Sequence, residues 1–238
     1  MRGTKLKLIS MDSAKQENEI YSQKELIEEG KKLLEAGDLK FINANIPNDE
    51  MSIMLFTSGT TSQSKIVALS HKNICTNLMD LASVLDVNSD DIFLSFLPLH
   101  HVFECTVGFL FALYRGAQTV FCDGMRHIVE NMKEYRVSVM ASVPAIYERI
   151  YKIMMKQAEK EGNIEKLQAD KIKFENASMA EKKKYFKHNR ICFGGNLKLM
   201  ISGAASLDTK IEAEYRKMGF NLMQGYGLTE TSPIISIG

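Results

Sequence analysis

The chain has 238 residues, 45% of them hydrophobic, with 30 lysines and arginines against 29 aspartates and glutamates. This length is enough to bury a core without disulfide or metal staples. The net charge of +1 argues against nucleic acid or an anionic membrane surface as the main partner. Four separated cysteines without a CxxC pair, and an N-terminus without the apolar stretch of a signal peptide, indicate a cytoplasmic protein. The longest apolar run, 105–114, is too short to span a membrane.

Residues 1–50 combine a short apolar run with one helical pattern. The run at 6–10 favours a strand. A helix is predicted from Ser22 to Ala36, with Ser22 as N-cap and Glu25 at the capping-box position. Gly37 stands just past its end, where a helix commonly needs a residue with positive φ.

From Met51 onward, short apolar runs alternate with helical stretches. Strands are predicted at 52–56, 66–69, 92–97, 117–121, 138–142, 197–201 and 221–224. Helices are predicted at 70–85, 107–114, 127–135 and 208–218. This alternation predicts an α/β fold with layered, largely parallel sheets flanked by helices.

The segment 156–190 departs from this alternation, because 16 of its 35 residues are charged. Ten of these are basic and six are acidic, which is typical of a solvated helical surface rather than a basic binding face. We therefore expect a charged helical insert that buries little surface.

A polar loop at 57–65 lies between two predicted strands and reads TSGTTSQSK. The backbone N–H groups of such a loop can form an anion-binding nest, with hydroxyl donors and the charge of Lys65 beside it. It lacks the second glycine of a Walker A loop, since Ser64 precedes the lysine. A phosphate cradle and a polar surface turn both remain open on composition alone.

A second glycine-rich loop, 224–233, reads QGYGLTETSP. Tyr226 could stack on a ring, and Thr229 could bind a phosphate. Glu230 could hold Mg²⁺, which prefers one or two carboxylates together with phosphate oxygens. The alternative is a glycine-rich turn whose tyrosine only packs.

Two shorter motifs complete the set. In LPLHHVFE at 97–104, His101 and Glu104 have a metal-ligand spacing, but no further donors lie nearby in sequence. A histidine that lines a pocket is the better interpretation, with a buried core histidine as the alternative. SGAA at 202–205 lets a flat ligand or a backbone segment approach closely. No GxSxG, HExxH or GxGxxG motif occurs, so hydrolase, zincin and Rossmann readings have no support.

Taken in this order, the four motifs resemble the adenylate-forming superfamily of acyl-CoA synthetases, luciferases and peptide-synthetase adenylation domains. The chain looks most like a long-chain fatty acyl-CoA synthetase, on account of the insert that follows 142–148 and of the segment FGGN at 193–196. The similarity runs from about Leu6 to Ile237. It implies that residues 1–238 are part of the large N-terminal adenylation domain of such an enzyme, with the insert at about 156–190.

The resemblance also implies roles for individual residues. The loop that holds the β- and γ-phosphates of ATP corresponds to Thr57, Ser58, Gly59, Thr60, Thr61 and Lys65. The nucleotide's adenine side corresponds to Gly203, Ala204, Ala205, Gln224, Gly225, Tyr226 and Gly227. Thr229 matches a phosphate-binding threonine, Glu230 the magnesium ligand and His101 the histidine near the substrate carboxylate. The catalytic set implied is Lys65, His101, Thr229 and Glu230, while Val143 and Pro144 match the start of the acyl pocket.

The chemistry implied has two steps and uses ATP, Mg²⁺ and coenzyme A. A fatty acid carboxylate attacks the α-phosphate of ATP, and the thiol of coenzyme A then displaces AMP from the acyl-adenylate. The expected parent is thus an AMP-forming long-chain fatty acid–CoA ligase with small-molecule substrates, no nucleic acid partner and no transmembrane segment; peripheral membrane contact stays open. The alternatives are an adenylate-forming enzyme for a shorter acid or an amino acid, and a non-catalytic nucleotide-binding module.

Three departures from the family pattern stand out. Ser62 occupies a position where the family usually has glycine, and Ser64 one where it usually has proline. The sequence also stops at Gly238, before the ribose-binding aspartate, the hinge and the C-terminal domain with its catalytic lysine. We therefore expect a fragment that does not form acyl-CoA by itself.

Overall fold

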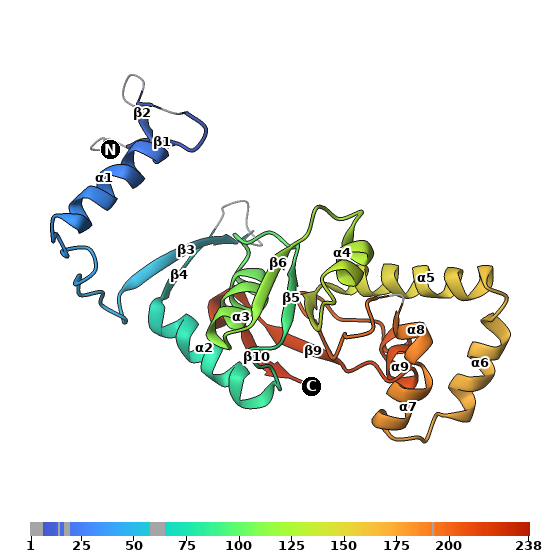
Figure 1. The fold of residues 1–238 in the computed structure, drawn as a ribbon. Helices are drawn as coiled ribbons and strands as arrows, with labels where there is room; N and C mark the ends of the chain where they lie inside the picture. Colours follow the sequence, from blue (N-terminus) through green and yellow to red (C-terminus); the bar gives the residue numbers. More distant parts are fainter. Residues whose placement is uncertain (1–6, 14, 17–19, 58–64, 192) are drawn as a thin grey trace. The chain divides into compact units, whose positions relative to one another are not determined.

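The computed structural model describes residues 7–13, 15–16, 20–57, 65–191 and 193–238. The chain divides into two compact units, Met1–Pro47 and Asn48–Gly238 (Figure 1). Within the described residues, no helix has the length and apolar character needed to cross a membrane.

The first unit contains two short parallel strands and one helix. Strand β1 (Leu8–Ser10) pairs with β2 (Ile20–Ser22). The sequence pattern did not predict β2. Helix α1 (Gln23–Glu35) begins after Ser22, whose hydroxyl accepts the Glu25 N–H at 3.4 Å, so the predicted N-cap is confirmed. The Glu25 carboxylate accepts the Gln16 N–H at 2.7 Å and so joins the loop before β2 to the helix.

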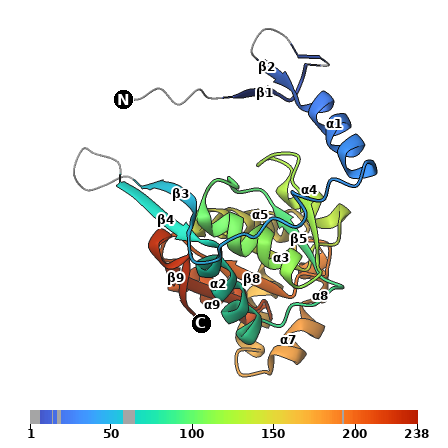
Figure 2. The same ribbon diagram turned by 90° about the vertical axis from the view of Figure 1, so that its left-hand side faces the viewer.

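The second unit opens with an antiparallel hairpin of β3 (Met51–Thr57) and β4 (Lys65–Ser70). Both strands were predicted, but they form a two-stranded sheet of their own outside the main sheet (Figure 2). Helix α2 (His71–Val84) follows directly and is capped by Ser70, whose hydroxyl accepts the Asn73 N–H.

The main sheet has six strands in the order β10-β9-β8-β7-β5-β6. Five of them run parallel, as predicted, and the last strand is antiparallel to its neighbour. Their bounds are β5 (Ile92–Ser95), β6 (Gln118–Phe121), β7 (Val139–Ser142), β8 (Leu199–Ser202), β9 (Leu222–Gly227) and β10 (Ile234–Ile237). Strand β10 was not predicted.

Successive side chains of the central strands point to opposite faces of the sheet, so both faces carry a hydrophobic core. Phe93 and Ala141 pack on one face with α2, the π-helix η1 (Glu104–Leu110) and α3 (Phe111–Tyr114). Leu94 and Met140 pack on the other with α4 (Ile128–Glu134), α5 (Pro144–Lys160) and α9 (Thr209–Lys217). The layered α/β fold predicted from the sequence is confirmed.

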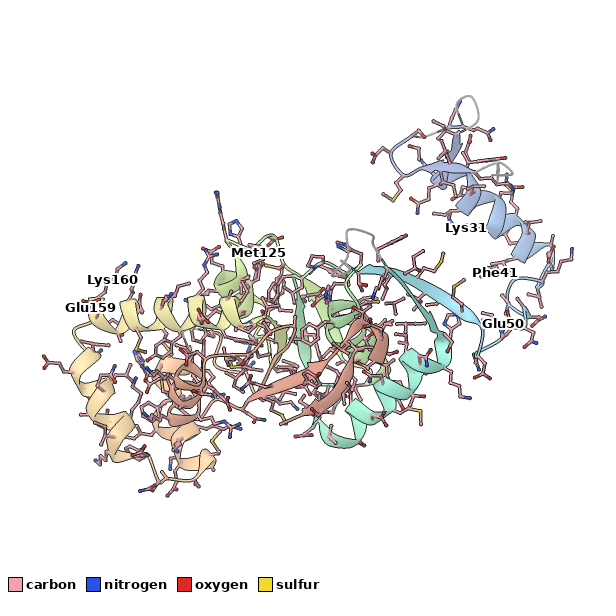
Figure 3. All side chains as sticks on the ribbon, turned by 180° about the vertical axis from the view of Figure 1, so that it is seen from behind. Lys31, Phe41, Glu50, Met125, Glu159 and Lys160 are labelled. Atoms are coloured by element: carbon pink, nitrogen blue, oxygen red, sulfur yellow. The ribbon has the colours of Figure 1, made fainter. Side chains whose placement is uncertain are left out.

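The charged insert is helical, as predicted, and comprises the end of α5 with α6 (Ile164–Lys173), α7 (Met179–Tyr185) and α8 (Lys187–Ile191). It buries more surface than its charge content suggests, since Leu167 and Phe186 belong to the hydrophobic core. The charged residues Glu159 and Lys160 point outward at the end of α5 (Figure 3). The insert is therefore a charged layer with an apolar inner side.

Candidate active site

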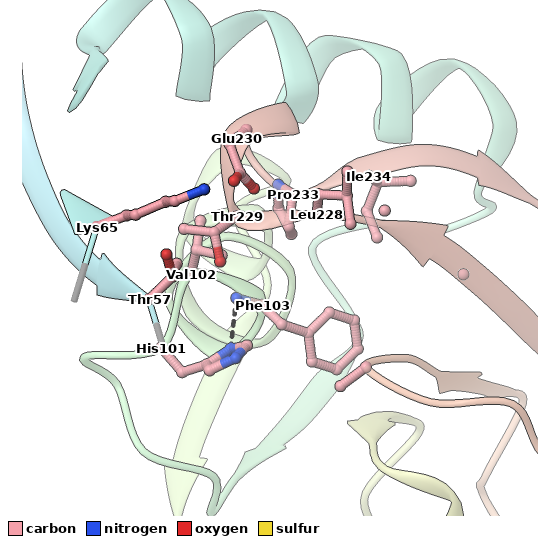
Figure 4. Close-up of a pocket in the computed structure, with 13 residues that line it drawn as sticks. Thr57, Lys65, His101, Val102, Phe103, Leu228, Thr229, Glu230, Pro233 and Ile234 are labelled. Atoms are coloured by element: carbon pink, nitrogen blue, oxygen red, sulfur yellow. Dashed lines mark hydrogen bonds between the residues drawn. The ribbon is translucent and has the colours of Figure 1, made fainter. Parts of the chain in front are cut away.

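A cavity of about 380 Å³ lies where the β3–β4 hairpin meets the carboxyl ends of the central parallel strands (Figure 4). Open α/β sheets bind their ligands at this end. The cavity is lined by Thr57, Lys65, His101, Val102, Phe103, Ala204, Gly225, Gly227, Leu228, Thr229, Glu230, Pro233 and Ile234. Each of the four sequence motifs thus contributes at least one lining residue.

The hairpin supplies Thr57 and Lys65, which pair in register where β3 ends and β4 begins. The Lys65 side chain extends toward Glu230 (Figure 4). Among the ion pairs between described residues, none involves Lys65 or Glu230, so both charges stay available to a ligand. The predicted phosphate-loop residues Ser58, Gly59, Thr60 and Thr61 lie outside the described residues, as do Ser62 and Ser64.

Thr229 and Glu230 stand on a short 3-10 turn, η2 (Thr229–Thr231), that follows β9. The buried Asn77 of α2 holds this segment, because its amide donates to the Ile234 carbonyl at 2.8 Å and to the Thr231 carbonyl at 3.5 Å. Asn77 was not among the predicted site residues. An amide on the same helix face as apolar Ile74 and Leu78 was the available signal.

Glycines make two close approaches next to the cavity. A Cβ at Gly227 would lie 1.7 Å from the Pro233 carbonyl oxygen, so only glycine fits where the loop folds back. A Cβ at Gly203 would lie 2.5 Å from the Phe103 ring. Ala204, the next residue, lines the cavity with φ of +67°, a conformation that non-glycine residues adopt at a cost and mostly at functional sites.

His101 lies in the segment between β5 and η1 and faces the cavity. Its Nδ1 accepts the Phe103 N–H at 3.2 Å, shown as the dashed line in Figure 4. With Nδ1 used as the acceptor, the neutral ring carries its proton on Nε2 and can donate it to an oxygen. The predicted pocket-lining histidine is therefore equipped to bind a carboxylate.

Some predicted residues do not line the cavity. The Gln224 amide donates to Glu212 at 2.6 Å and accepts the Leu207 N–H at 3.1 Å. Its side chain therefore holds α9 and the segment that leads into it. Tyr226 is 62% exposed. Gly203, Ala205, Gln224 and Tyr226 are all missing from the lining residues, while Gly225 and Gly227 belong to them. Their roles toward the nucleotide stay predictions.

Within the described residues, no group of three or more histidines, cysteines, aspartates and glutamates could hold a metal ion by itself. Glu230 with the adjacent Thr229 does fit Mg²⁺, which binds through one or two carboxylates and takes its other ligands from water and phosphate. The His101–Glu104 spacing does not form a metal site there, because the Glu104 carboxyl is buried against Ser95.

The chain was then compared with known proteins. Residues 3–238 match the family model described as "AMP-binding enzyme". Long chain acyl-CoA synthetase 6, peroxisomal, of Arabidopsis thaliana is 29% identical over 206 residues, which are 79% of this chain and 28% of that protein. Long-chain-fatty-acid–CoA ligase 5 of Mus musculus is 31% identical over 204 residues, 79% of this chain and 30% of its own. The chain thus spans about a third or less of the length of these relatives.

A solved structure supports the fold independently. The N-terminal domain of FACL13 from Mycobacterium tuberculosis superposes with a TM-score of 0.60 at 21% identity, over 82% of this chain and 41% of that one. At this identity the likeness concerns the fold alone.

Proposed function

Since the chain belongs to the AMP-binding enzyme family, we propose that the protein is an AMP-forming acid–thiol ligase that converts a long-chain fatty acid into its acyl-CoA. The observation that supports it most is the single cavity in which Lys65, His101 and the Thr229–Glu230 turn meet. The long-chain substrate rests on the names of the two relatives above, both long-chain fatty acyl-CoA ligases.

The first step joins the acid to the nucleotide. One carboxylate oxygen attacks the α-phosphorus of ATP, the bond to the bridging oxygen breaks, and pyrophosphate leaves. The step needs neutralisation of phosphate charge and in-line positioning rather than a protein nucleophile. Glu230 would hold Mg²⁺, which when bound would supply part of that neutralisation.

Three side chains divide the remaining work. The Lys65 ammonium faces the departing phosphates and offsets their charge, and the Thr229 hydroxyl donates to a phosphate oxygen. The Nε2–H of His101 donates to the substrate carboxylate and orients it toward the phosphorus. In the second step the thiolate of coenzyme A attacks the acyl carbon, and AMP leaves with the electron pair of the broken C–O bond.

The test is carboxylate-dependent exchange of labelled pyrophosphate into ATP by the complete natural protein. We expect exchange with palmitate that falls steeply through octanoate to acetate, and none with amino acids. Exchange that is independent of chain length, or that requires an amino acid, would favour an adenylating enzyme for another acid. No exchange with any acid, together with ATP binding by calorimetry, would leave a non-catalytic nucleotide-binding module.

A further inference from the structure

Glu104 is a buried carboxylic acid that the proposed mechanism does not use. It is 0% exposed and is the first residue of the π-helix η1, directly after the cavity-lining Val102 and Phe103. Its Oε1 accepts the Ser95 hydroxyl at 2.6 Å, and the Phe96 N–H also donates to the carboxyl. Its Oε2 has no hydrogen-bond partner among the described residues. π-helical turns occur frequently at functional sites.

The missing side chain of Gly108 leaves the space that this carboxyl occupies. A Cβ at Gly108, one turn along η1, would lie 2.6 Å from Oε2 and 2.7 Å from the carboxyl carbon of Glu104. Any other residue at 108 would require the Glu104 carboxyl or the backbone beside it to shift. Packing therefore explains the glycine at 108, although glycine inside a helix costs about 1 kcal/mol of stability relative to alanine.

No cation forms an ion pair with Glu104 within the described part of the chain. Burial raises its pKa to about 7, against the lowering effect of the Ser95 and Phe96 hydrogen bonds. Burial raises the pKa of the neighbouring Cys105 and Tyr147, and the charge of Glu104 adds to both shifts. Toward Ser95 and Phe96 the carboxyl acts as a hydrogen-bond acceptor.

The Ser95–Glu104 bond joins the end of β5 to the wall that carries His101, Val102 and Phe103. The Phe103 ring in turn packs against Gly203, at the start of the loop whose Ala204 also lines the cavity. The same wall therefore determines where His101 stands relative to the 203–204 backbone.

We propose that Glu104 is a positioning residue, whose carboxyl, anchored on Ser95 and accommodated by Gly108, fixes the His101–Phe103 wall for binding and activation of the acid. This role rests on the proposed function. Glu104 acts on the acid side of the cavity, while Lys65, Thr229 and Glu230 serve the nucleotide side. Because the wall also packs on Gly203, losing the anchor should impair use of the acid much more than it weakens nucleotide binding.

The experiment compares E104Q, E104L and S95A with a matched control, T106V, in the complete natural protein. Thr106 is a good control because it is buried in the same π-helix, and its hydroxyl has no partner among the described residues. For each variant, kcat and KM for the acid come from pyrophosphate exchange, and Kd for ATP comes from calorimetry.

We expect E104L to lower kcat/KM for the acid about 10- to 100-fold, with a much smaller change in Kd for ATP. E104Q keeps the acceptor oxygen and should retain most of the activity, and S95A should show a smaller loss in the same direction as E104L. Loss of ATP binding together with acid turnover would mean general unfolding and would overturn the role, as would an E104L protein as active as T106V. An E104Q protein as impaired as E104L would show that charge, and not the anchor, matters.

If E104L does not fold, S95A alone decides between these outcomes, because it removes one hydroxyl and keeps the carboxyl. Absence of exchange in the wild type would overturn the proposed function and this role together. Full activity of both E104L and S95A beside an active wild type would overturn this role alone.

Discussion

The buried polar groups at the two ends of the six-stranded sheet differ in whether they have hydrogen-bond or ion-pair partners. At the amino end, Asp91 precedes β5 and is 4% exposed. Its carboxylate accepts the Ser138 hydroxyl at 2.7 Å and the Asn88 N–H at 2.9 Å, and pairs with Lys198 at 2.7 Å. Burial acts to raise the pKa of Asp91, but these partners hold it below its usual range.

At the carboxyl end of the same strand, Glu104 is equally buried and has no cation beside it among the described residues, so burial prevails and its pKa rises. The hydroxyls of Ser142 and Ser202, the last residues of β7 and β8, are also buried without partners in that part of the chain. The difference between the ends is therefore one of partners rather than of depth. At the amino end the buried polar groups are paired, which stabilises the fold. At the carboxyl end, next to the cavity, some of them stay unpaired.

The largest effect is expected from Glu230→Gln, which removes the one carboxyl group among the described residues that line the cavity. Carboxylate-dependent pyrophosphate exchange should fall about 100-fold or more, as when a group that stabilises developing charge is lost. The free energy of unfolding should change by less than about 0.5 kcal/mol, since the residue is exposed. Glu50→Gln, at another exposed glutamate, is the control. A fully active E230Q protein would contradict the placement of the metal and phosphate charges at this turn.

At the amino end the effect should fall on stability instead. Asp91→Ala leaves the partly buried Lys198 without its counter-charge and the Ser138 hydroxyl without its acceptor. We expect the free energy of unfolding, measured in urea, to drop by about 3 to 4 kcal/mol, with turnover per folded molecule unchanged. Asp90→Ala, at the exposed neighbour, should cost almost nothing. Equal losses for the two variants would show that the Asp91 network does not stabilise this end.

The comparison also predicts a pH effect. The pKa of Glu104 is about 7 in the folded protein against a usual 4.5, so the folded state binds its proton more tightly than the unfolded state does. The stability from this group is complete below pH 4.5 and is lost as the pH rises to about 7, by at most about 3 kcal/mol. Urea unfolding of the wild type and E104Q across this range measures it. Because glutamine does not titrate, the two curves should diverge as the pH rises, and parallel curves would contradict the assignment.

The sequence alone predicted those features of the fold and the site whose signals are local. Apolar runs located most strands, and Ser22 and Ser70 marked two helix starts, because periodicity and capping are local properties. Motifs located Lys65 and Glu230 by their chemistry. The strand order of the main sheet was out of reach, since strands such as β7 and β8 pair side by side although they lie far apart in the sequence.

The same limit applies to side chains whose hydrogen-bond partners lie on another helix or strand. The Gln224 amide turns toward Glu212 on α9, and nothing in the QGYG pattern indicates that direction. The sequence analysis noted Glu104 only for its spacing from His101, because its real partner, Ser95, precedes the motif and belongs to β5. Functional motifs were visible in the sequence, whereas the groups that hold them in place were not.

The smallest effect gives the sharpest form of the comparison, because Ser138 directly precedes strand β7 and Ser142 is its last residue. The Ser138 hydroxyl donates to Asp91 and accepts the Ile92 N–H at 2.9 Å, so Ser138→Ala should cost about 1 to 2 kcal/mol of unfolding free energy. The Ser142 hydroxyl is buried without a partner among the described residues, so Ser142→Ala removes only an unsatisfied group and should be neutral or slightly stabilising. Urea unfolding of the two variants side by side measures both. Equal costs would mean that the hydroxyl at the carboxyl end is bonded after all, and that the two ends do not differ in how their polar groups are satisfied.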